Sequence, residues 1–135
     1  MDRQKILIID DDPDIAELIK ITLEANDYDV CHASSGDEGL KKVKGLRPDL
    51  IILDVMMDSI TEGFQVSYQL RDPDPDSEYR EFSRTPIIML TGVQQQMGMK
   101  FSPEKDGDYL PVDAFLEKPV RVDSLLEHIR KLLPR

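Results

Sequence analysis

The 135-residue chain has a single cysteine, two histidines, no tryptophan and no long apolar run. With Cys31 alone, no disulfide can form within the chain, which favours a reducing compartment, and we expect this thiol to be buried. His32 and His128 lack the spacing of metal ligands, so we interpret both as structural or surface residues. No run approaches the roughly 20 apolar residues of a membrane span, and the N-terminus does not resemble a signal peptide. These absences favour a cytoplasmic protein without membrane insertion.

Basic residues are also fewer than acidic ones. The chain has 17 lysines and arginines and 27 aspartates and glutamates, which gives a net charge of −10. This balance argues against direct nucleic-acid binding, which needs basic surface to neutralise phosphates. The proportions of 40% hydrophobic and 33% charged residues are those of a folded domain rather than a disordered segment. The length suits one hydrophobic core. We therefore expect residues 1–135 to form one domain, with no output domain in this chain.

Four short apolar runs each lead into a residue able to do chemistry. The runs and the residues at their ends are Ile6–Ile9 with Asp10, Leu50–Leu53 with Asp54, Ile87–Leu90 with Thr91, and Ala114–Leu116 with Lys118. In a parallel sheet the carboxyl ends of the strands lie at one edge, where ligands bind. Carboxylates, a hydroxyl and an ammonium group should therefore meet in one cleft, which suits a divalent cation and a phosphoryl group.

The segments between these runs alternate between helix and strand. Apolar residues at helical spacing predict one helix from Pro13 to about Ala25, with Asp12 as its N-cap. A second helix should follow Ser35, which has the form of a capping box with Glu38. Further elements are a strand over 28–33 and a final helix over 122–133. This order predicts an α/β, flavodoxin-like three-layer fold: a five-stranded parallel sheet of order 2-1-3-4-5 with helices on both faces.

Three stretches of the sequence have less regular patterns. The stretch Asp72–Ser77 holds two prolines and three aspartates, which predicts an exposed loop, with a short helical turn near Glu78–Phe82. A weak helical stretch opens at Gly63. Any helix within Gly92–Leu110 should be short or broken, because glycines and a proline interrupt it.

The polar positions at the strand ends resemble the receiver domain of response regulators, the CheY-like family of two-component signal transduction. The resemblance covers the chain from Lys5 to about Leu133. The residues that carry it are Asp10–Asp11, Asp54, Thr91–Gly92, Phe115 and Lys118–Pro119. It implies a phosphoacceptor switch that assists its own phosphorylation and dephosphorylation, rather than an enzyme with a separate substrate.

The resemblance also implies a magnesium site. Asp54 would accept a phosphoryl group from a phosphohistidine. Asp11 and Asp54 would bind Mg²⁺ directly, the backbone carbonyl of Met56 would be a third ligand, and Asp10 would act mainly through water. A hard cation of this kind offsets the charge that two anionic reactants bring together. Two adjacent carboxylates at Asp10 and Asp11 are otherwise unfavourable, because like charges repel.

Three further positions have implied roles in the switch. The Lys118 ammonium would pair with a phosphoryl oxygen, and the Lys118–Pro119 bond would be cis so that the lysine points into the cleft. The Thr91 hydroxyl would donate to another phosphoryl oxygen. Phe115 would then move inward into the space that Thr91 opens.

The implied partners are a sensor histidine kinase or a histidine phosphotransfer protein. The output would go to an unidentified protein target, or to a second copy of the domain, through the face of the fourth helix, fifth strand and fifth helix.

Two other classes of protein use related folds. A haloacid-dehalogenase-like phosphohydrolase would use Asp10 as its nucleophile, because Asp10 and Asp12 resemble that family's first motif, but Asp54 would then have no role. A flavin-binding module would need a hydroxyl- and glycine-rich loop after the first strand, where this chain has acids.

Overall fold

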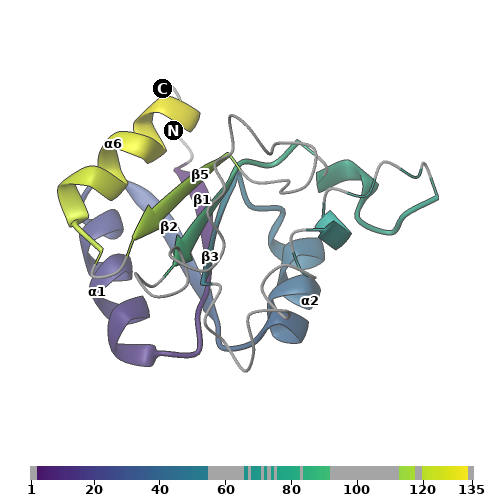
Figure 1. Ribbon diagram of the computed structural model, residues 1–135, viewed down its shortest axis with the longest axis horizontal. Helices are drawn as coiled ribbons and strands as arrows, with labels where there is room; N and C mark the ends of the chain where they lie inside the picture. The colour runs from purple at the N-terminus through teal and green to yellow at the C-terminus, as the bar shows by residue number, and fades with distance from the viewer. Residues whose placement is uncertain are drawn as a thin grey trace.

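The computed structural model describes residues 3–54, 66, 68–70, 72, 74, 76–82, 84–91, 113–117 and 120–133. The side chains of Thr91, Phe115 and Glu117 are not among the described parts. Within these ranges the chain forms an α/β fold built on a parallel sheet (Figure 1).

The sheet consists of parallel strands whose apolar runs are those that the sequence indicates. The strands are β1 (Gln4–Ile9), β2 (Tyr28–Ala33), β3 (Leu50–Asp54), β4 (Ile87–Thr91) and β5 (Ala114–Glu117). They lie in the order β2-β1-β3-β4-β5, and each neighbouring pair is parallel. Because helices cover both faces of the sheet, the described parts of its inner strands are apolar on both sides.

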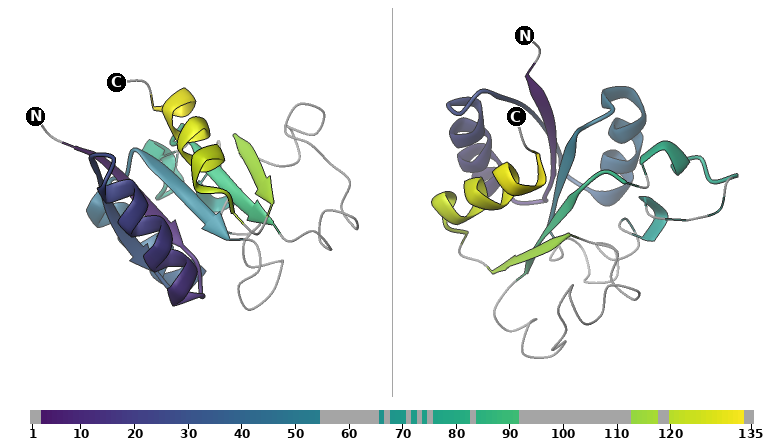
Figure 2. Two further views of the ribbon diagram at one scale, coloured as in Figure 1. Left: turned by 90° about the vertical axis from the view of Figure 1, so that its left-hand side faces the viewer. Right: turned by 90° about the horizontal axis from the view of Figure 1, so that it is seen from above.

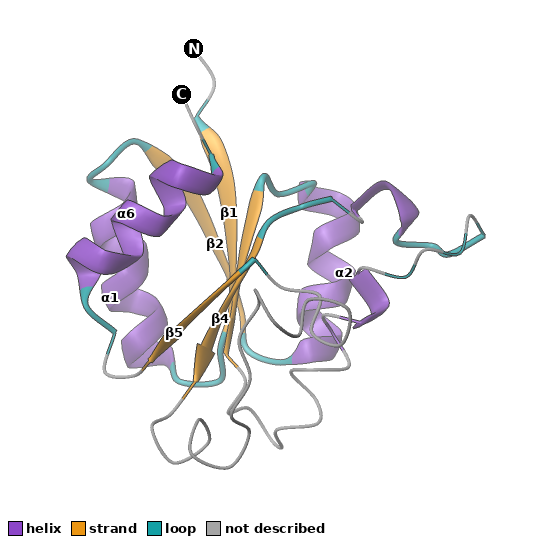
Figure 3. Ribbon diagram, turned by 45° about the horizontal axis from the view of Figure 1, so that its top comes forward, coloured by secondary structure: helices purple, strands orange, loops and turns teal. Residues whose placement is uncertain are grey.

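The helices form two layers around the sheet. They are α1 (Pro13–Glu24), α2 (Gly36–Leu46) and α6 (Val122–Leu132), with a short 3₁₀ helix, η1 (Arg80–Phe82). Helices α1 and α6 lie together on one face, and α2 lies on the other (Figures 2 and 3). Successive strand residues alternate between the two cores: Leu7 and Ile9 pack on the α2 side, and Ile6 and Ile8 pack on the α1 and α6 side. The predicted three-layer α/β arrangement is confirmed to this extent.

The starts of α1 and α2 follow the sequence signals, with one difference. Asp12 caps α1, because its Oδ1 accepts from the backbone amides of Asp14 at 3.0 Å and Ile15 at 3.4 Å. Ser35 caps α2, and its Oγ accepts from the Glu38 amide at 3.2 Å. The Glu38 carboxylate does not complete the expected capping box on Ser35, however. It reaches one residue further back and accepts from the Ser34 amide at 3.1 Å and from the Ser34 hydroxyl at 2.8 Å.

The predicted helical turn near residues 78–82 is confirmed as η1, and it packs on α2. Tyr79 and Phe82 are buried in the core between the sheet and α2. Lys44 lies 5.0 Å from the centroid of the Tyr79 ring. Ion pairs join Lys44 to Glu78 and, at 2.7 Å, Arg47 to Glu81.

The remaining expectations have mixed outcomes. Asp72, Asp74 and Asp76 are exposed, as predicted for that loop. Val66 and residues 68–70 are helical, whereas Gly63 and the stretch Gly92–Leu110 lie outside the described residues. The prediction that Cys31 is buried is wrong: it is half-buried, because β2 is an edge strand with a neighbour on one side only. Among the described residues, no helix combines the length and the apolar character that crossing a membrane requires.

Candidate metal and phosphoryl site

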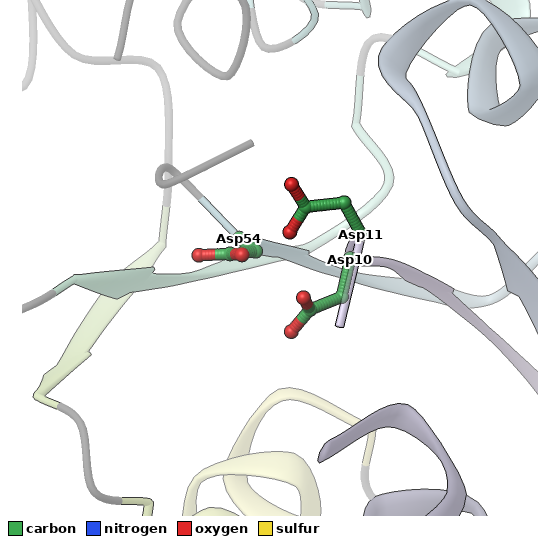
Figure 4. A group of neighbouring side chains, drawn as sticks. All are labelled: Asp10, Asp11 and Asp54. Atoms are coloured by element: carbon green, nitrogen blue, oxygen red, sulfur yellow. The ribbon is translucent and has the colours of Figure 1, made fainter. Parts of the chain in front are cut away.

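Three aspartates meet at the carboxyl ends of β1 and β3. Asp10 follows the last residue of β1, Asp11 comes next, and Asp54 ends β3. Because β1 and β3 are neighbours and Ile9 lies opposite Leu53, the residues after them are brought side by side (Figure 4). One carboxylate oxygen from each aspartate lies within 4.8 Å of the other two. The predicted cluster of acids is therefore present.

The burial of these carboxylates makes their proximity costly. Asp10 and Asp54 are 0% and 1% exposed, whereas Asp11 is exposed. Two unit negative charges at such a separation repel by on the order of 3 kcal/mol at an effective dielectric constant of about 20. The first turn of α1 begins nearby, and its partial positive charge offsets only a fraction of this repulsion. A bound cation would remove most of it.

The chemistry of the three donors fits magnesium. All are carboxylate oxygens, which hard divalent cations prefer, and Mg²⁺ bound by a few protein oxygens usually keeps several waters as its other ligands. Neither histidine nor cysteine belongs to the cluster, so the donor set does not resemble a zinc site.

The backbone around Asp10 is held by bonds that the sequence pattern does not reveal. The Asp10 amide donates to the Ala33 carbonyl at 3.0 Å, and Asp10 Oδ1 accepts from the Asp12 amide at 2.9 Å. His32 Nε2 lies 2.7 Å from the carbonyl oxygen of Asp10. The contact between His32 and Asp10 could have been found only from the position of His32, which is the penultimate residue of the neighbouring strand β2 and pairs with Ile8 of β1.

The corner between β2 and α2 carries a perturbed carboxyl group close to His32. Hydrogen bonds from the Ser34 hydroxyl and amide, aided by the Lys42 ammonium, lower the pKa of Glu38 from 4.5 to about 2. Lys42 Nζ lies 3.1 Å from Glu38 Oε1 and also donates to the His32 carbonyl at 2.5 Å.

The other predicted site residues are described only in part. Thr91 ends β4, where it lies opposite Glu117 of β5, so its backbone is at the same edge of the sheet as the aspartates. Phe115 lies opposite Met89, also by its backbone alone. Met56, Lys118 and Pro119 lie outside the described residues, so the roles assigned to them, including the cis bond, stay predictions.

The fold and the site together define an α/β domain with a cluster of carboxylates, able to hold a cation, at one edge of a parallel sheet. A family model described as "Response regulator receiver domain" matches residues 6–130, and the chain belongs to this family, the receivers of two-component systems. The family model, and the place of Asp54 in the acidic cluster, give no support to the phosphohydrolase alternative.

Named relatives agree with this family. The chain is 37% identical over 97% of its length to the DNA-binding dual master transcriptional regulator RpaA of Synechocystis sp. and covers 49% of that protein. It is 33% identical over 98% of its length to the alkaline phosphatase synthesis transcriptional regulatory protein PhoP of Bacillus subtilis and again covers 49% of the relative. The chain thus spans about half the length of the curated relatives it matches.

Solved structures show the same architecture. The chemotaxis response regulator CheY4 of Vibrio cholerae superposes with a TM-score of 0.73 at 32% identity, over 97% of this chain and 99% of that one. A response regulator receiver domain from Clostridium thermocellum gives 0.73 at 29% identity, over 96% and 93%. Receiver domains interact with histidine kinases and generally bind Mg²⁺ at an acidic pocket.

Proposed function

We propose that this chain is the phosphoacceptor of a two-component phosphorelay and that Asp54 carries the phosphoryl group. The observation that supports this most directly is the position of Asp54 in the carboxylate cluster. Strand β3 is central in the sheet, so Asp54 has the acids that follow β1 on one side and the end of β4, with Thr91, on the other. No other described aspartate lies between two such neighbours.

The proposed reaction is a transfer between two nucleophiles. An oxygen of Asp54 attacks the phosphorus of a phosphohistidine on a sensor kinase or phosphotransfer protein. The phosphorus–nitrogen bond breaks, and its electron pair stays with the imidazole nitrogen. Because acceptor and phosphoryl group are both anionic, positioning and charge stabilisation are what the domain must supply.

Asp10, Asp11, Asp54 and the carbonyl of Met56 would hold Mg²⁺. The bound ion supplies positive charge to the phosphoryl oxygens and the acceptor. Asp10, which is fully buried and accepts from the Asp12 amide, keeps the acidic loop in place.

We further propose that the Lys118 ammonium and the Thr91 hydroxyl bind phosphoryl oxygens, and that Phe115 moves inward when Thr91 does. The signal would leave through the face that includes β5 and α6, toward a protein target or a second copy of the domain. Some relatives are named as DNA-binding regulators, but the acidic balance of these 135 residues offers no basis for direct nucleic-acid contact here.

Phosphorylation by a small donor tests this proposal. The protein is incubated with acetyl phosphate, with Mg²⁺ or with chelator, and intact mass and peptide mapping report the labelled residue. We expect one phosphoryl group per chain, on Asp54, only when Mg²⁺ is present. Asp54→Asn should abolish labelling without loss of fold, because the amide has nearly the same shape but is not a nucleophile.

Asp14→Asn is the matched control, since it makes the same chemical change at an exposed carboxylate of α1 outside the cluster. It should label like the wild type. Labelling that persists in chelator would refute the metal requirement, and phosphate mapped to Asp10 or Asp12 would move the assignment to the phosphohydrolase class.

A further inference from the structure

The histidine beside the acidic cluster has a defined bonding role. His32 Nε2 and the carbonyl oxygen of Asp10 are 2.7 Å apart. A carbonyl oxygen can only accept, so Nε2 must carry the hydrogen and donate it. The carbonyl of Asp10 and the amide of Asp11 belong to one planar peptide unit. The bond therefore fixes the plane from which Asp11 and its carboxylate extend.

The backbone of His32 is in turn held by a residue of α2. Lys42, on α2, donates to the His32 carbonyl at 2.5 Å and pairs with Glu38 at 3.1 Å. Glu38 is in turn bonded to Ser34, two residues after His32. The imidazole thus belongs to a connected set of bonds that runs from the start of α2 to the loop after β1.

The exposure of Asp11 explains why this bond should matter for binding. Asp10 and Asp54 are buried and their side chains have little freedom, but Asp11 is exposed. Its carboxylate is placed mainly by its backbone. If the peptide before it rotates, one of the three oxygens leaves the cluster, and the ion loses a ligand.

We propose that His32 is a positioning residue of the carboxylate cluster, which holds the Asp10–Asp11 peptide through its Nε2–H and thereby sets the affinity of the cluster for Mg²⁺. This inference rests on the proposed function, because it assumes that the cluster binds Mg²⁺. His32 touches neither the ion nor the phosphoryl group and acts through Asp10 and Asp11.

The test measures Mg²⁺ affinity rather than activity. Backbone amide resonances are followed in ¹H–¹⁵N NMR spectra as MgCl₂ is added to the wild type, His32→Leu and His32→Gln. Leucine fills similar space but cannot donate, and we expect it to weaken Mg²⁺ binding about tenfold, the usual scale for residues that orient metal ligands. Glutamine offers an amide N–H near the position of Nε2 and should restore most of the affinity. A role in packing alone would not produce this rescue.

His128→Leu is the matched control, because His128 makes the same kind of bond, from Nδ1 to the Ser124 carbonyl at 2.8 Å, within α6. Its Mg²⁺ affinity should equal that of the wild type. Equal affinities for the wild type and His32→Leu would overturn the inference and leave the proposed function intact, and so would equal weakening by leucine and glutamine. Failure of the wild type to bind Mg²⁺ would overturn both.

The wild type offers a further test if His32→Leu does not fold. Long-range ¹H–¹⁵N spectra of the imidazole report which ring nitrogen carries the hydrogen. A protonated Nε2 whose resonance shifts on addition of Mg²⁺ supports the inference. An Nε2 without hydrogen cannot donate to Asp10 and would overturn it.

Discussion

Substitution of Gly39 by alanine tests how closely α2 packs on the strand that leads into the acidic site. A Cβ atom at this position would lie 2.5 Å from Cδ1 and 2.8 Å from Cγ1 of Ile9. Ile9 is fully buried and comes directly before Asp10. Rotation of the Ile9 side chain can move Cδ1 away, but Cγ1 moves only if the backbone or the whole rotamer changes. The helix and the strand must therefore separate or strain.

Two opposing effects set the size of the change. Overpacking of a filled core costs about 1–3 kcal/mol, and replacement of a helical glycine by alanine gains about 1 kcal/mol. The net expectation for Gly39→Ala is a loss of about 0–2 kcal/mol in the free energy of unfolding. Gly45 provides a matched control on the same helix, because nothing lies within 4 Å of its added Cβ. Gly45→Ala should therefore gain about 0.5–1 kcal/mol.

The difference between the two variants isolates the contact with Ile9, since the helix preference appears in both. Urea unfolding followed by circular dichroism at constant m-value measures it, and we expect Gly39→Ala to be about 1–3 kcal/mol less stable than Gly45→Ala. In the Ile9→Val background, which lacks Cδ1, the penalty of Gly39→Ala should shrink. Equal stabilisation by both alanines would refute the close packing of α2 on β1.

Three further predictions concern stability. Asp12→Ala removes the cap that accepts from Asp14 and Ile15 and should cost about 1 kcal/mol in urea unfolding. The pKa of Glu38 is about 2 in the folded state, against an ordinary value of 4.5. The carboxylate of Glu38 therefore contributes fully to the free energy of unfolding above pH 4.5, and this contribution is lost as pH falls toward 2. In Glu38→Gln, the free energy of unfolding should depend less on pH between these two values. Burial raises the pKa of Tyr79 above 10.0. The wild type should therefore lose stability as pH rises past 10, and Tyr79→Phe should lose less. Thermal unfolding at a series of alkaline pH values measures this difference.

Much of the site follows from local sequence. Apolar runs such as Ile6–Ile9 and Leu50–Leu53 can be recognised without neighbours, because a strand buried on both faces needs an uninterrupted run of such residues. Because alternating strands and helices give parallel strands, the carboxyl ends of these strands then lie at one edge of the sheet. The sequence alone therefore places Asp10, Asp11 and Asp54 together, and in the structure one carboxylate oxygen from each lies within 4.8 Å of the other two.

The features that could not be predicted depend on contacts between distant segments. Cys31 is half-buried because its strand is at the sheet edge, which no local pattern records. Glu38 bonds to Ser34 instead of completing a capping box on Ser35, since the chain bends at the end of β2 and presents that amide. The same bend places Lys42 on the His32 carbonyl.

The segment that contains η1 shows which kind of contact decides its position on α2. The pairs Lys44–Glu78 and Arg47–Glu81 are exposed at the surface, where an ion pair contributes about 0–1 kcal/mol. Tyr79 and Phe82 are buried in the core, and burial of an aromatic side chain of this size contributes about 1.5–3 kcal/mol. The aromatic side chains therefore hold the segment, and the ion pairs mainly set its orientation.

The aspartates of the acidic site are positioned by two different sets of contacts. The ends of β1 and β3 are fixed relative to each other by the sheet, through pairs such as Ile9 with Leu53, so a change in the core would shift Asp10 and Asp54 together. The peptide that carries Asp11 lies beyond the last of these pairs, and its carbonyl contacts His32 near the end of β2. Binding of a cation by three oxygens requires both. A variant that keeps the sheet but loses the contact between His32 and the Asp10–Asp11 peptide should therefore keep its fold and bind the cation more weakly. Substitutions only a few residues apart would then affect either stability or cation affinity.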